Sequence, residues 1–229
     1  MKYLIIGGSS GIGKTLAELL AAEGNEVFAT YFKSEVSSGD IHFQYLDVTA
    51  NEIELDNLPE VLDGVVFCPG SINLLPFHRF KAEDFAKDYQ LQVVGAVKVI
   101  QAVLPNLKKS KQASIVLFST VAVQSGFTFH AQVAASKGAI EGLTRSLAAE
   151  FSPQIRVNAI APSLTQTPLA EKLINTEQKM EANANRHPLK RIGQTDDIAQ
   201  MAVFLLSAKS SWVTGQIMHV DGGMSSIKG

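Results

Sequence analysis

A glycine-rich turn near the amino terminus is the first segment whose residue types suggest a chemistry. Residues 7–13 read Gly-Gly-Ser-Ser-Gly-Ile-Gly, directly after a short apolar run and directly before a helical run. We expect Gly7 to form the tight turn, Gly11 to let the backbone approach a pyrophosphate, and Gly13 to let the helix pack close to the sheet. The NH groups at the start of a helix also attract an anion. The turn therefore predicts a dinucleotide-binding loop.

The residues after the second predicted strand bear on which dinucleotide is bound. An acidic side chain there would bind the ribose 2′-hydroxyl and repel a 2′-phosphate. The stretch from Ala29 to Ser34 contains no acid and offers hydroxyls, including that of Tyr31, and one cation, Lys33. Because these groups suit a 2′-phosphate through charge-assisted hydrogen bonds, the sequence favours NADP(H) over NAD(H).

The elements that must position these residues alternate along the chain. Short apolar runs alternate with amphipathic stretches, a pattern typical of βα units that feed a parallel sheet buried on both faces. We predict strands near residues 3–6, 26–30, 42–46, 64–67, 114–118, 156–160 and 217–220. We predict helices near residues 13–22, 82–107, 134–151, 169–180 and 196–206. The fold class is therefore α/β, with a parallel sheet of about seven strands and helices on both faces.

Composition excludes several classes of function. The chain has 229 residues and a net charge of −2, so it offers no broad basic surface to a nucleic acid. The single cysteine, Cys68, rules out a disulfide framework and fits a reducing compartment, which predicts a cytoplasmic protein. No apolar run resembles a signal peptide or approaches the ~18 residues of a membrane span. The histidines show no ligand spacing, so we expect no metal.

The glycine turn resembles the Thr-Gly-x-x-x-Gly-x-Gly motif of the short-chain dehydrogenase/reductase family, with Ile6 at the threonine position. The similarity then runs the whole length of the chain. It includes the pair Asp47-Val48, the segment Cys68-Pro69-Gly70 in place of Asn-Asn-Ala-Gly, residues 156–163 with Ser163 in place of a glycine, and the ending over residues 214–223. The resemblance implies a single doubly wound Rossmann-like domain over residues 1–229, and a homodimer or homotetramer formed through the helices near 82–107 and 134–151.

The resemblance also implies where a nicotinamide cofactor binds. Asp47 and Val48 would contact the adenine ring, the segment from Cys68 to Gly70 would pass beside the adenine ribose, and residues 156–163 would lead to the nicotinamide. The expected cofactor-binding residues are Gly7, Ser9, Ser10, Gly11, Ile12, Gly13, Tyr31, Lys33, Asp47, Val48, Cys68, Pro69, Gly70, Lys137, Pro162, Leu164, Thr165 and Thr167.

The catalytic positions are where this sequence departs from the family. The family uses a tyrosine four residues before a lysine, whose ammonium lowers the pKa of the phenol that moves the proton. Here Lys137 is present, but Val133 stands at the tyrosine position and cannot transfer a proton. Thr120 stands at the family's serine position, and Gln92 at its asparagine position. The four tyrosines lie at position 89 or earlier, so no other register restores the acid.

Three interpretations remain open. His130, about one helical turn before Val133, could shuttle protons beside Lys137, or it could be a partly exposed residue at a helix start. The substrate or bound water could instead supply the proton. Alternatively, the protein could bind NADP(H) without turnover, as a redox sensor or an inactive oligomer partner.

The expected activity is hydride transfer between a nicotinamide and a small carbonyl or alcohol substrate, with Thr120, Lys137, His130 and Gln92 as the catalytic set. Residues 123–132 and 175–191 are expected to shape the substrate pocket, and the second segment is expected to act as a mobile lid.

Overall fold

A seven-stranded parallel sheet forms the centre of the computed structural model, which describes residues 1–33, 36 and 38–227. Ser34 of the second-strand segment lies outside the described residues. The strand order is β3-β2-β1-β4-β5-β6-β7, and every neighbouring pair is parallel. The strands are β1 (Lys2–Ile6), β2 (Glu26–Tyr31), β3 (Ile41–Tyr45), β4 (Gly64–Phe67), β5 (Ala113–Phe118), β6 (Ile155–Pro162) and β7 (Ile217–Val220). This architecture confirms the predicted α/β fold.

The central strands β1, β4 and β5 are mostly apolar because helices cover both faces of the sheet. In β1, Leu4 and Ile6 point into one core cluster, whereas Tyr3 and Ile5 point into the other. Such alternation follows from the two-residue period of a strand. Continuous apolar runs therefore mark buried parallel strands here, as the sequence predicted.

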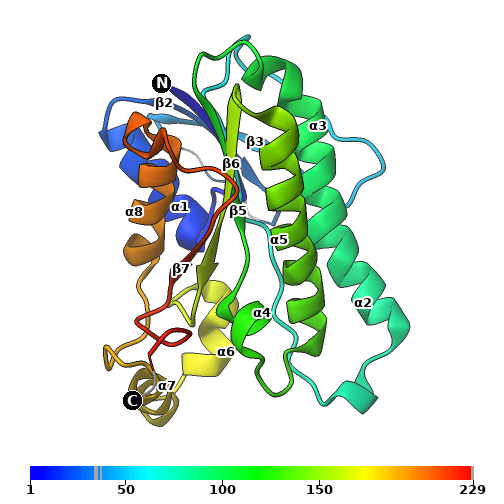
Figure 1. Ribbon diagram of the computed structural model, residues 1–229, viewed down its shortest axis with the longest axis vertical. Coiled ribbons are helices and arrows are strands. Elements are labelled where there is room, and N and C mark those ends of the chain that lie inside the picture. Colours follow the sequence, from blue (N-terminus) through cyan, green and yellow to red (C-terminus); the bar gives the residue numbers. More distant parts are fainter. Residues whose placement is uncertain (34–35, 37, 228–229) are drawn as a thin grey trace.

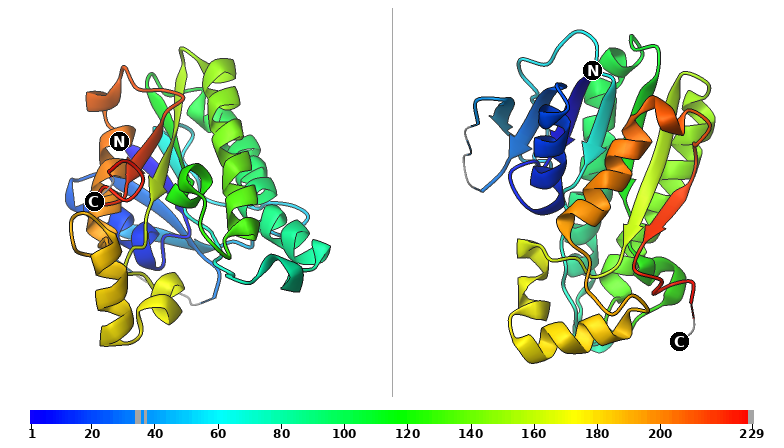
Figure 2. Two further views of the ribbon diagram at one scale, coloured as in Figure 1. Left: turned by 60° about the horizontal axis from the view of Figure 1, so that its bottom comes forward. Right: turned by 90° about the vertical axis from the view of Figure 1, so that its left-hand side faces the viewer.

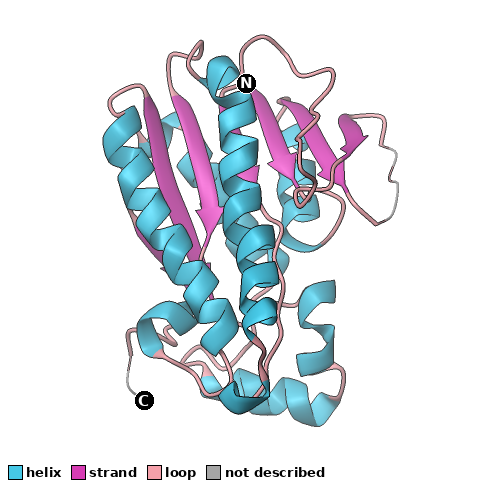
Figure 3. Cartoon of the chain, turned by 90° about the vertical axis from the view of Figure 1, so that its right-hand side faces the viewer, coloured by secondary structure: helices cyan, strands magenta, loops and turns pink. Residues whose placement is uncertain are grey.

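The helices form two layers, one on each face. On one face, α1 (Gly11–Ala22) packs beside α8 (Thr195–Leu206); on the other, α3 (Gly95–Leu107) lies beside α5 (Ala131–Phe151) (Figures 1 and 3). Three short helices gather where the strands end, namely α4 (Val121–Ser125), α6 (Glu171–Ile174) and α7 (Glu177–Arg186) (Figure 2). Among the described residues, no helix combines the length and apolarity needed to cross a membrane.

Two predicted helices differ from the structure. The predicted helix over residues 82–107 is α2 (Ala82–Tyr89), a π-helical turn (Gln90–Val94) and then α3. The single helix predicted over residues 169–180 is wrong. A 3₁₀ turn and α6 end at Ile174, and α7 then begins because the Thr176 hydroxyl caps its first turn by accepting from the Lys179 NH.

Two smaller differences affect the site. Helix α5 begins at Ala131, three residues before its predicted start, which places Gln132 and Val133 on the helix. Helix α4 was not predicted; it begins after Thr120, whose hydroxyl accepts a hydrogen bond from the Ala122 NH.

The close packing between β4 and α8 gives a stability prediction. A Cβ at Gly64 would lie 2.7 Å from Leu206 Cδ2 and 2.9 Å from the Ser114 carbonyl oxygen. We expect Gly64→Ala to lower the free energy of unfolding by roughly 1–3 kcal/mol, measured by urea denaturation. The matched control is Gly142→Ala on the exposed side of α5, which should gain about 0.5–1 kcal/mol because alanine is the better helix former. Equal stabilities of the two variants would contradict this packing.

Candidate functional site

A cavity of about 280 Å³ lies where the strands end, and it gathers residues from distant parts of the sequence. All the predicted catalytic residues line it, as does Val133. They are Gln92, Thr120, His130 and Lys137. Seven predicted cofactor-binding residues besides Lys137 also line it, namely Ile12, Cys68, Gly70, Pro162, Leu164, Thr165 and Thr167. The loops after β4, β5 and β6 therefore converge on one site, as expected at the carboxyl edge of a parallel sheet.

The glycine turn lies beside this cavity. Gly7 and Gly11 have φ angles of +77° and +54°, which glycine adopts most readily. A Cβ at Gly11 would lie 3.5 Å from the Thr167 side chain, and a Cβ at Gly13 would collide with the Gly7 carbonyl. Helix α1 begins at this turn, and the side chain of its N-cap residue, Ser10, makes no capping hydrogen bond within the described chain. The Ser10 side chain therefore leaves the first NH groups of α1 available to an anion.

The end of β2 lies outside the cavity. The Thr30 hydroxyl accepts a 3.0 Å hydrogen bond from the Gly7 NH and so joins β2 to the glycine turn. Tyr31 is half-buried, with its ring 6.0 Å from that of Tyr45. Lys33 is exposed and makes no ion pair with the described residues.

Other predicted cofactor-binding residues also make contacts within the chain. The Asp47 carboxylate accepts hydrogen bonds from the NH and hydroxyl of Thr49, at 2.8 and 2.6 Å, and these bonds lower its pKa. Val48 is buried, 3.1 Å from where a Cβ of Gly95 would stand. Pro69 packs against Gly7. The expected contact of Asp47 and Val48 with an adenine ring stays a prediction.

The buried ammonium of Lys137 dominates the electrostatics of the cavity. Its side chain projects from α5, the residue is only 8% exposed, and it makes no hydrogen bond with any described residue. Burial lowers the pKa of Lys137 to about 8, although Asp88 and Cys68 act in the opposite direction. Burial also raises the pKa of Cys68 to about 12, so this thiol stays protonated. With this pKa the Lys137 side chain is mostly protonated at pH 7, and it brings a positive charge to the cavity.

A carboxylate that sequence reasoning missed fixes the orientation of Gln92. The Gln92 amide nitrogen donates to both oxygens of Asp88, at 2.9 and 2.8 Å, and the Ser71 hydroxyl donates to the same carboxylate. The opposite atom, Gln92 Oε1, is buried without a partner in the described structure. It lies 3.4 Å from where a Cβ of Gly70 would stand, and Lys137 Nζ lies 3.9 Å from that point. The four-residue spacing of Asp88 and Gln92 was the available sequence signal.

His130 is anchored at the start of α5. Its Nδ1 lies 2.8 Å from the Thr128 carbonyl oxygen, and its ring lies 5.5 Å from that of Phe127. Because a carbonyl only accepts, Nδ1 carries the proton and Nε2 is the nitrogen left for a ligand or water. Val133 is 7% exposed and forms an apolar part of the cavity wall.

The cavity wall contains a second polar pair, which the sequence did not reveal. Ser163 Oγ lies 2.8 Å from His187 Nε2, and His187 Nδ1 lies 2.8 Å from the Asn183 carbonyl oxygen. The two side chains are 24 residues apart in sequence. The available signal was the serine at Ser163, where the related motif has glycine. Residues 175–191, expected as a mobile lid, contribute α7 and residues 183, 186 and 187 to the cavity wall.

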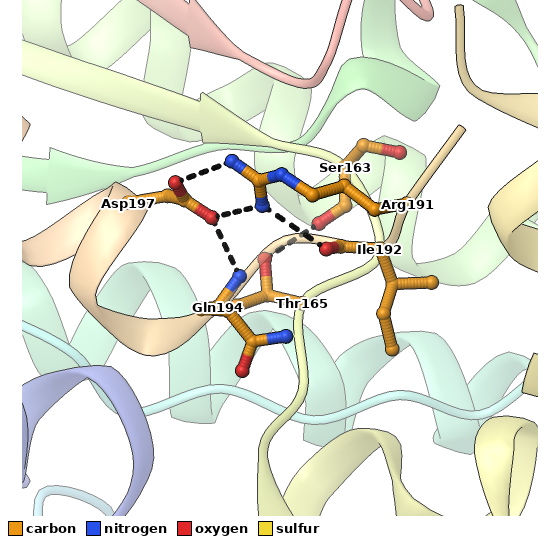
Figure 4. Close-up of polar contacts among 6 residues, drawn as sticks. All are labelled: Ser163, Thr165, Arg191, Ile192, Gln194 and Asp197. Atoms are coloured by element: carbon orange, nitrogen blue, oxygen red, sulfur yellow. Dashed lines mark hydrogen bonds and ion pairs between the residues drawn. The ribbon is translucent and has the colours of Figure 1, made fainter. Parts of the chain in front are cut away.

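An ion pair fixes the segment beside this wall. Arg191 donates to both carboxylate oxygens of Asp197, at 2.6 and 2.7 Å, which lowers the pKa of the carboxyl (Figure 4). The Gln194 NH donates to the same carboxylate. The Thr165 hydroxyl donates to the Ser163 carbonyl at 3.0 Å, a local hydrogen bond in the segment directly after β6. In the part of the chain that is described, no three His, Cys, Asp or Glu side chains group as metal ligands.

The burial of Lys137 generates a prediction for stability against pH. The folded protein binds its ammonium proton less tightly than the unfolded chain, since the pKa falls from 10.5 to about 8. The charged Lys137 therefore lowers the free energy of unfolding by about 3 kcal/mol below pH 8, and this loss disappears as the pH rises toward 10.5. We expect Lys137→Met to raise the free energy of unfolding at pH 7, measured by urea denaturation, and to gain less at pH 10. Lys172→Met, at an exposed position, is the control. A gain independent of pH would contradict a charged, buried Lys137.

Comparison with known proteins agrees with this geometry. Residues 7–225 match the family model described as enoyl-(acyl carrier protein) reductase. The chain is 35% identical to the 3-oxoacyl-[acyl-carrier-protein] reductase FabG of Thermotoga maritima, over 96% of each chain, and 30% identical to a tropinone reductase homolog of Arabidopsis thaliana, over 97% of this chain and 91% of the other. Among solved structures, a short-chain type dehydrogenase/reductase from Mycobacterium ulcerans has a TM-score of 0.87 at 28% identity and is matched over 100% of this chain and 90% of its own. ElxO with NADP bound also has a TM-score of 0.87 at 28% identity, over 99% of each chain. The chain therefore belongs to the short-chain dehydrogenase/reductase family.

Proposed function

We propose that this family member is an NADP(H)-dependent oxidoreductase that transfers hydride between a nicotinamide and a small carbonyl or alcohol substrate, with a proton donor other than tyrosine. The observation that carries the proposal is the convergence of Lys137, Thr120 and Gln92 on one cavity beside the glycine turn. The names of relatives support a reductase, since FabG is a 3-oxoacyl-[acyl-carrier-protein] reductase.

The residues present fit a dinucleotide. The left-handed Gly7 and Gly11 and the uncapped start of α1 suit a pyrophosphate. The unpartnered Gln92 Oε1 and the Lys137 ammonium, both near Gly70, are polar atoms that a bound ligand or ordered water would satisfy. When bound, the nicotinamide supplies or accepts the hydride.

The residues of the chain itself orient the substrate, stabilise charge and donate the proton. The Thr120 hydroxyl orients the substrate oxygen, and the Lys137 ammonium stabilises negative charge in the cavity. Val133 contributes shape but no proton. His130 is the proton donor that the sequence alone suggests, acting through Nε2.

A second candidate function is NADP(H) binding without turnover, as a redox sensor or an inactive partner of an oligomer. The buried, apolar Val133 favours it, because the cofactor-binding features are retained where the family's acid is absent. We further propose that residues 1–229 act as one nucleotide-binding domain in the cytoplasm. The neighbouring helices α3 and α5 are the proposed surface for a homodimer or homotetramer (Figure 3).

The cofactor assignment is tested by isothermal calorimetry. NADPH should bind at least tenfold more tightly than NADH, because Lys33 and the hydroxyl of Tyr31 can pair with the 2′-phosphate. Lys33→Ala should weaken NADPH binding several-fold and leave NADH binding unchanged, whereas Lys111→Ala, at another exposed lysine, should change neither. Equal or reversed affinities of the native protein for the two cofactors would refute the preference.

The position of Val133 is tested by restoring the phenol. Val133 and Lys137 share one face of α5 and line the same cavity, so Val133→Tyr should raise the rate of carbonyl reduction. A positioned general acid contributes roughly 10²–10⁴ in rate. Val133→Phe is the matched control, because it adds the same ring without the hydroxyl. If the tyrosine variant folds, binds NADPH and is no faster than the phenylalanine variant, the cavity does not retain the family's geometry.

A further inference from the structure

Ser163 and His187 form a hydrogen-bonded chain that runs from the protein backbone to the cavity. His187 is the residue directly after α7 and is 2% exposed. Its Nδ1 meets the Asn183 carbonyl and its Nε2 meets the Ser163 hydroxyl, each at 2.8 Å. Because the carbonyl can only accept, Nδ1 always carries a hydrogen. Nε2 is therefore the one ring nitrogen that gains or loses a proton.

The surrounding structure fixes the hydrogen-bonded pair Ser163 and His187. The Asn183 side chain donates to the Leu173 and Lys179 carbonyls, at 3.1 and 2.9 Å, and so ties α7 to α6. A Cβ at Gly222 would lie 3.6 Å from the His187 ring, so the turn after β7 packs against the imidazole. The ring is thus fixed from two sides by elements far apart in the sequence.

The Ser163 hydroxyl is placed at the end of β6, and both Ser163 and His187 line the cavity that holds Thr120, Val133 and Lys137. The Ser163 carbonyl is already occupied by Thr165, and in Figure 4 the hydroxyl points away from that contact. A distance of 2.8 Å suits either direction of the bond, from hydroxyl to a neutral imidazole or from an imidazolium to the hydroxyl.

We propose that Ser163 and His187 form the proton relay that replaces the missing tyrosine. This inference rests on the proposed reductase function and names its proton donor. It assigns to the pair, in preference to His130, the transfer of the proton to the substrate oxygen. His130 lacks a comparable connection, since within the described chain its ring is hydrogen-bonded only to the Thr128 carbonyl, two residues away, and the residue is partly exposed.

The step balances in atoms and charge. In reduction, a dihydronicotinamide held beside the glycine turn would supply the hydride for the new C–H bond at the carbonyl carbon. The Ser163 hydroxyl proton forms the new O–H bond at the carbonyl oxygen, while the Nε2 proton of the His187 imidazolium moves to Ser163 Oγ. The substrate becomes an alcohol, the nicotinamide would be left oxidised, and the neutral imidazole regains one proton from solvent, so each turnover consumes one hydride and one solvent proton.

The test compares variants by steady-state kinetics, calorimetry and nitrogen NMR. Ser163→Ala should lower kcat roughly 10²-fold, with KM and NADPH affinity changed less than about threefold, and Ser163→Thr should recover most of the rate because it keeps the hydroxyl. His187→Asn should lose a similar factor. The double variant should be no slower than either single variant, since the two residues act as one unit. His130→Ala should lose less than Ser163→Ala.

Matched controls are Ser211→Ala and His78→Asn, which remove the same groups at exposed positions outside the cavity. Nitrogen NMR of the cofactor-free protein should show His187 with Nδ1 protonated, and its Nε2 signal should shift in Ser163→Ala. Native protein that turns over while Ser163→Ala is equally fast overturns the relay and leaves the reductase standing. Native protein that binds NADPH and reduces no carbonyl removes both. A His187 with Nε2 protonated and Nδ1 bare overturns the relay whatever the rates.

Discussion

The buried ammonium of Lys137 is the interaction on which the rest of the site depends. A cation in this position lowers stability at neutral pH, because burial disfavours its charge and lowers its pKa to about 8. The neighbouring structure limits that penalty. Asp88 supplies a nearby negative charge, and Gly70 has no side chain that would fill the space between Lys137 and Gln92. A site that keeps such a costly charge, with no hydrogen-bond partner among the described residues, is well suited to bind an external one.

The π-helical turn between α2 and α3 is the second feature of this arrangement. It spans Gln90–Val94 and contains the buried Gln92, whose amide is held by Asp88 from the preceding helix. Turns of this kind are rare and occur often at functional sites. Here the turn contains Gln92, whose carbonyl oxygen lies at the cavity and has no hydrogen-bond partner among the described residues. The π-helical turn therefore places the Gln92 carbonyl oxygen at the cavity.

Much of the fold could be predicted because burial on both faces leaves a strong pattern. All seven strands were predicted near their observed positions, since continuous apolar runs such as β1 and β5 have few other interpretations. The helix predicted over residues 169–180 was wrong because this window is polar and short. There the hydroxyl of Thr176, and not periodicity, decides where a helix begins.

The candidate site was less predictable where it depends on contacts between distant residues. Predicted site residues from the loops after β4, β5 and β6 line one cavity, whereas those at the end of β2 lie outside it. In the sequence Asp88 is not distinguishable from a surface acid. In the structure it is buried and bonded to Gln92 and Ser71. The partnership of Ser163 with His187 depends on how α7 returns to the end of β6, which no local pattern encodes.

We propose that this cavity binds NADP(H) and uses it without the family's tyrosine. The most direct measurement is a single-turnover experiment on the unmodified protein. Enzyme is kept in slight excess over NADPH, and calorimetry confirms that the NADPH is bound. The complex is then mixed with each of a panel of ketones and aldehydes while the NADPH absorbance is followed. We expect loss of the dihydronicotinamide absorbance, with one alcohol formed for each NADPH consumed, for at least one class of carbonyl compound. Tight binding of NADPH with no oxidation across the whole panel would contradict it.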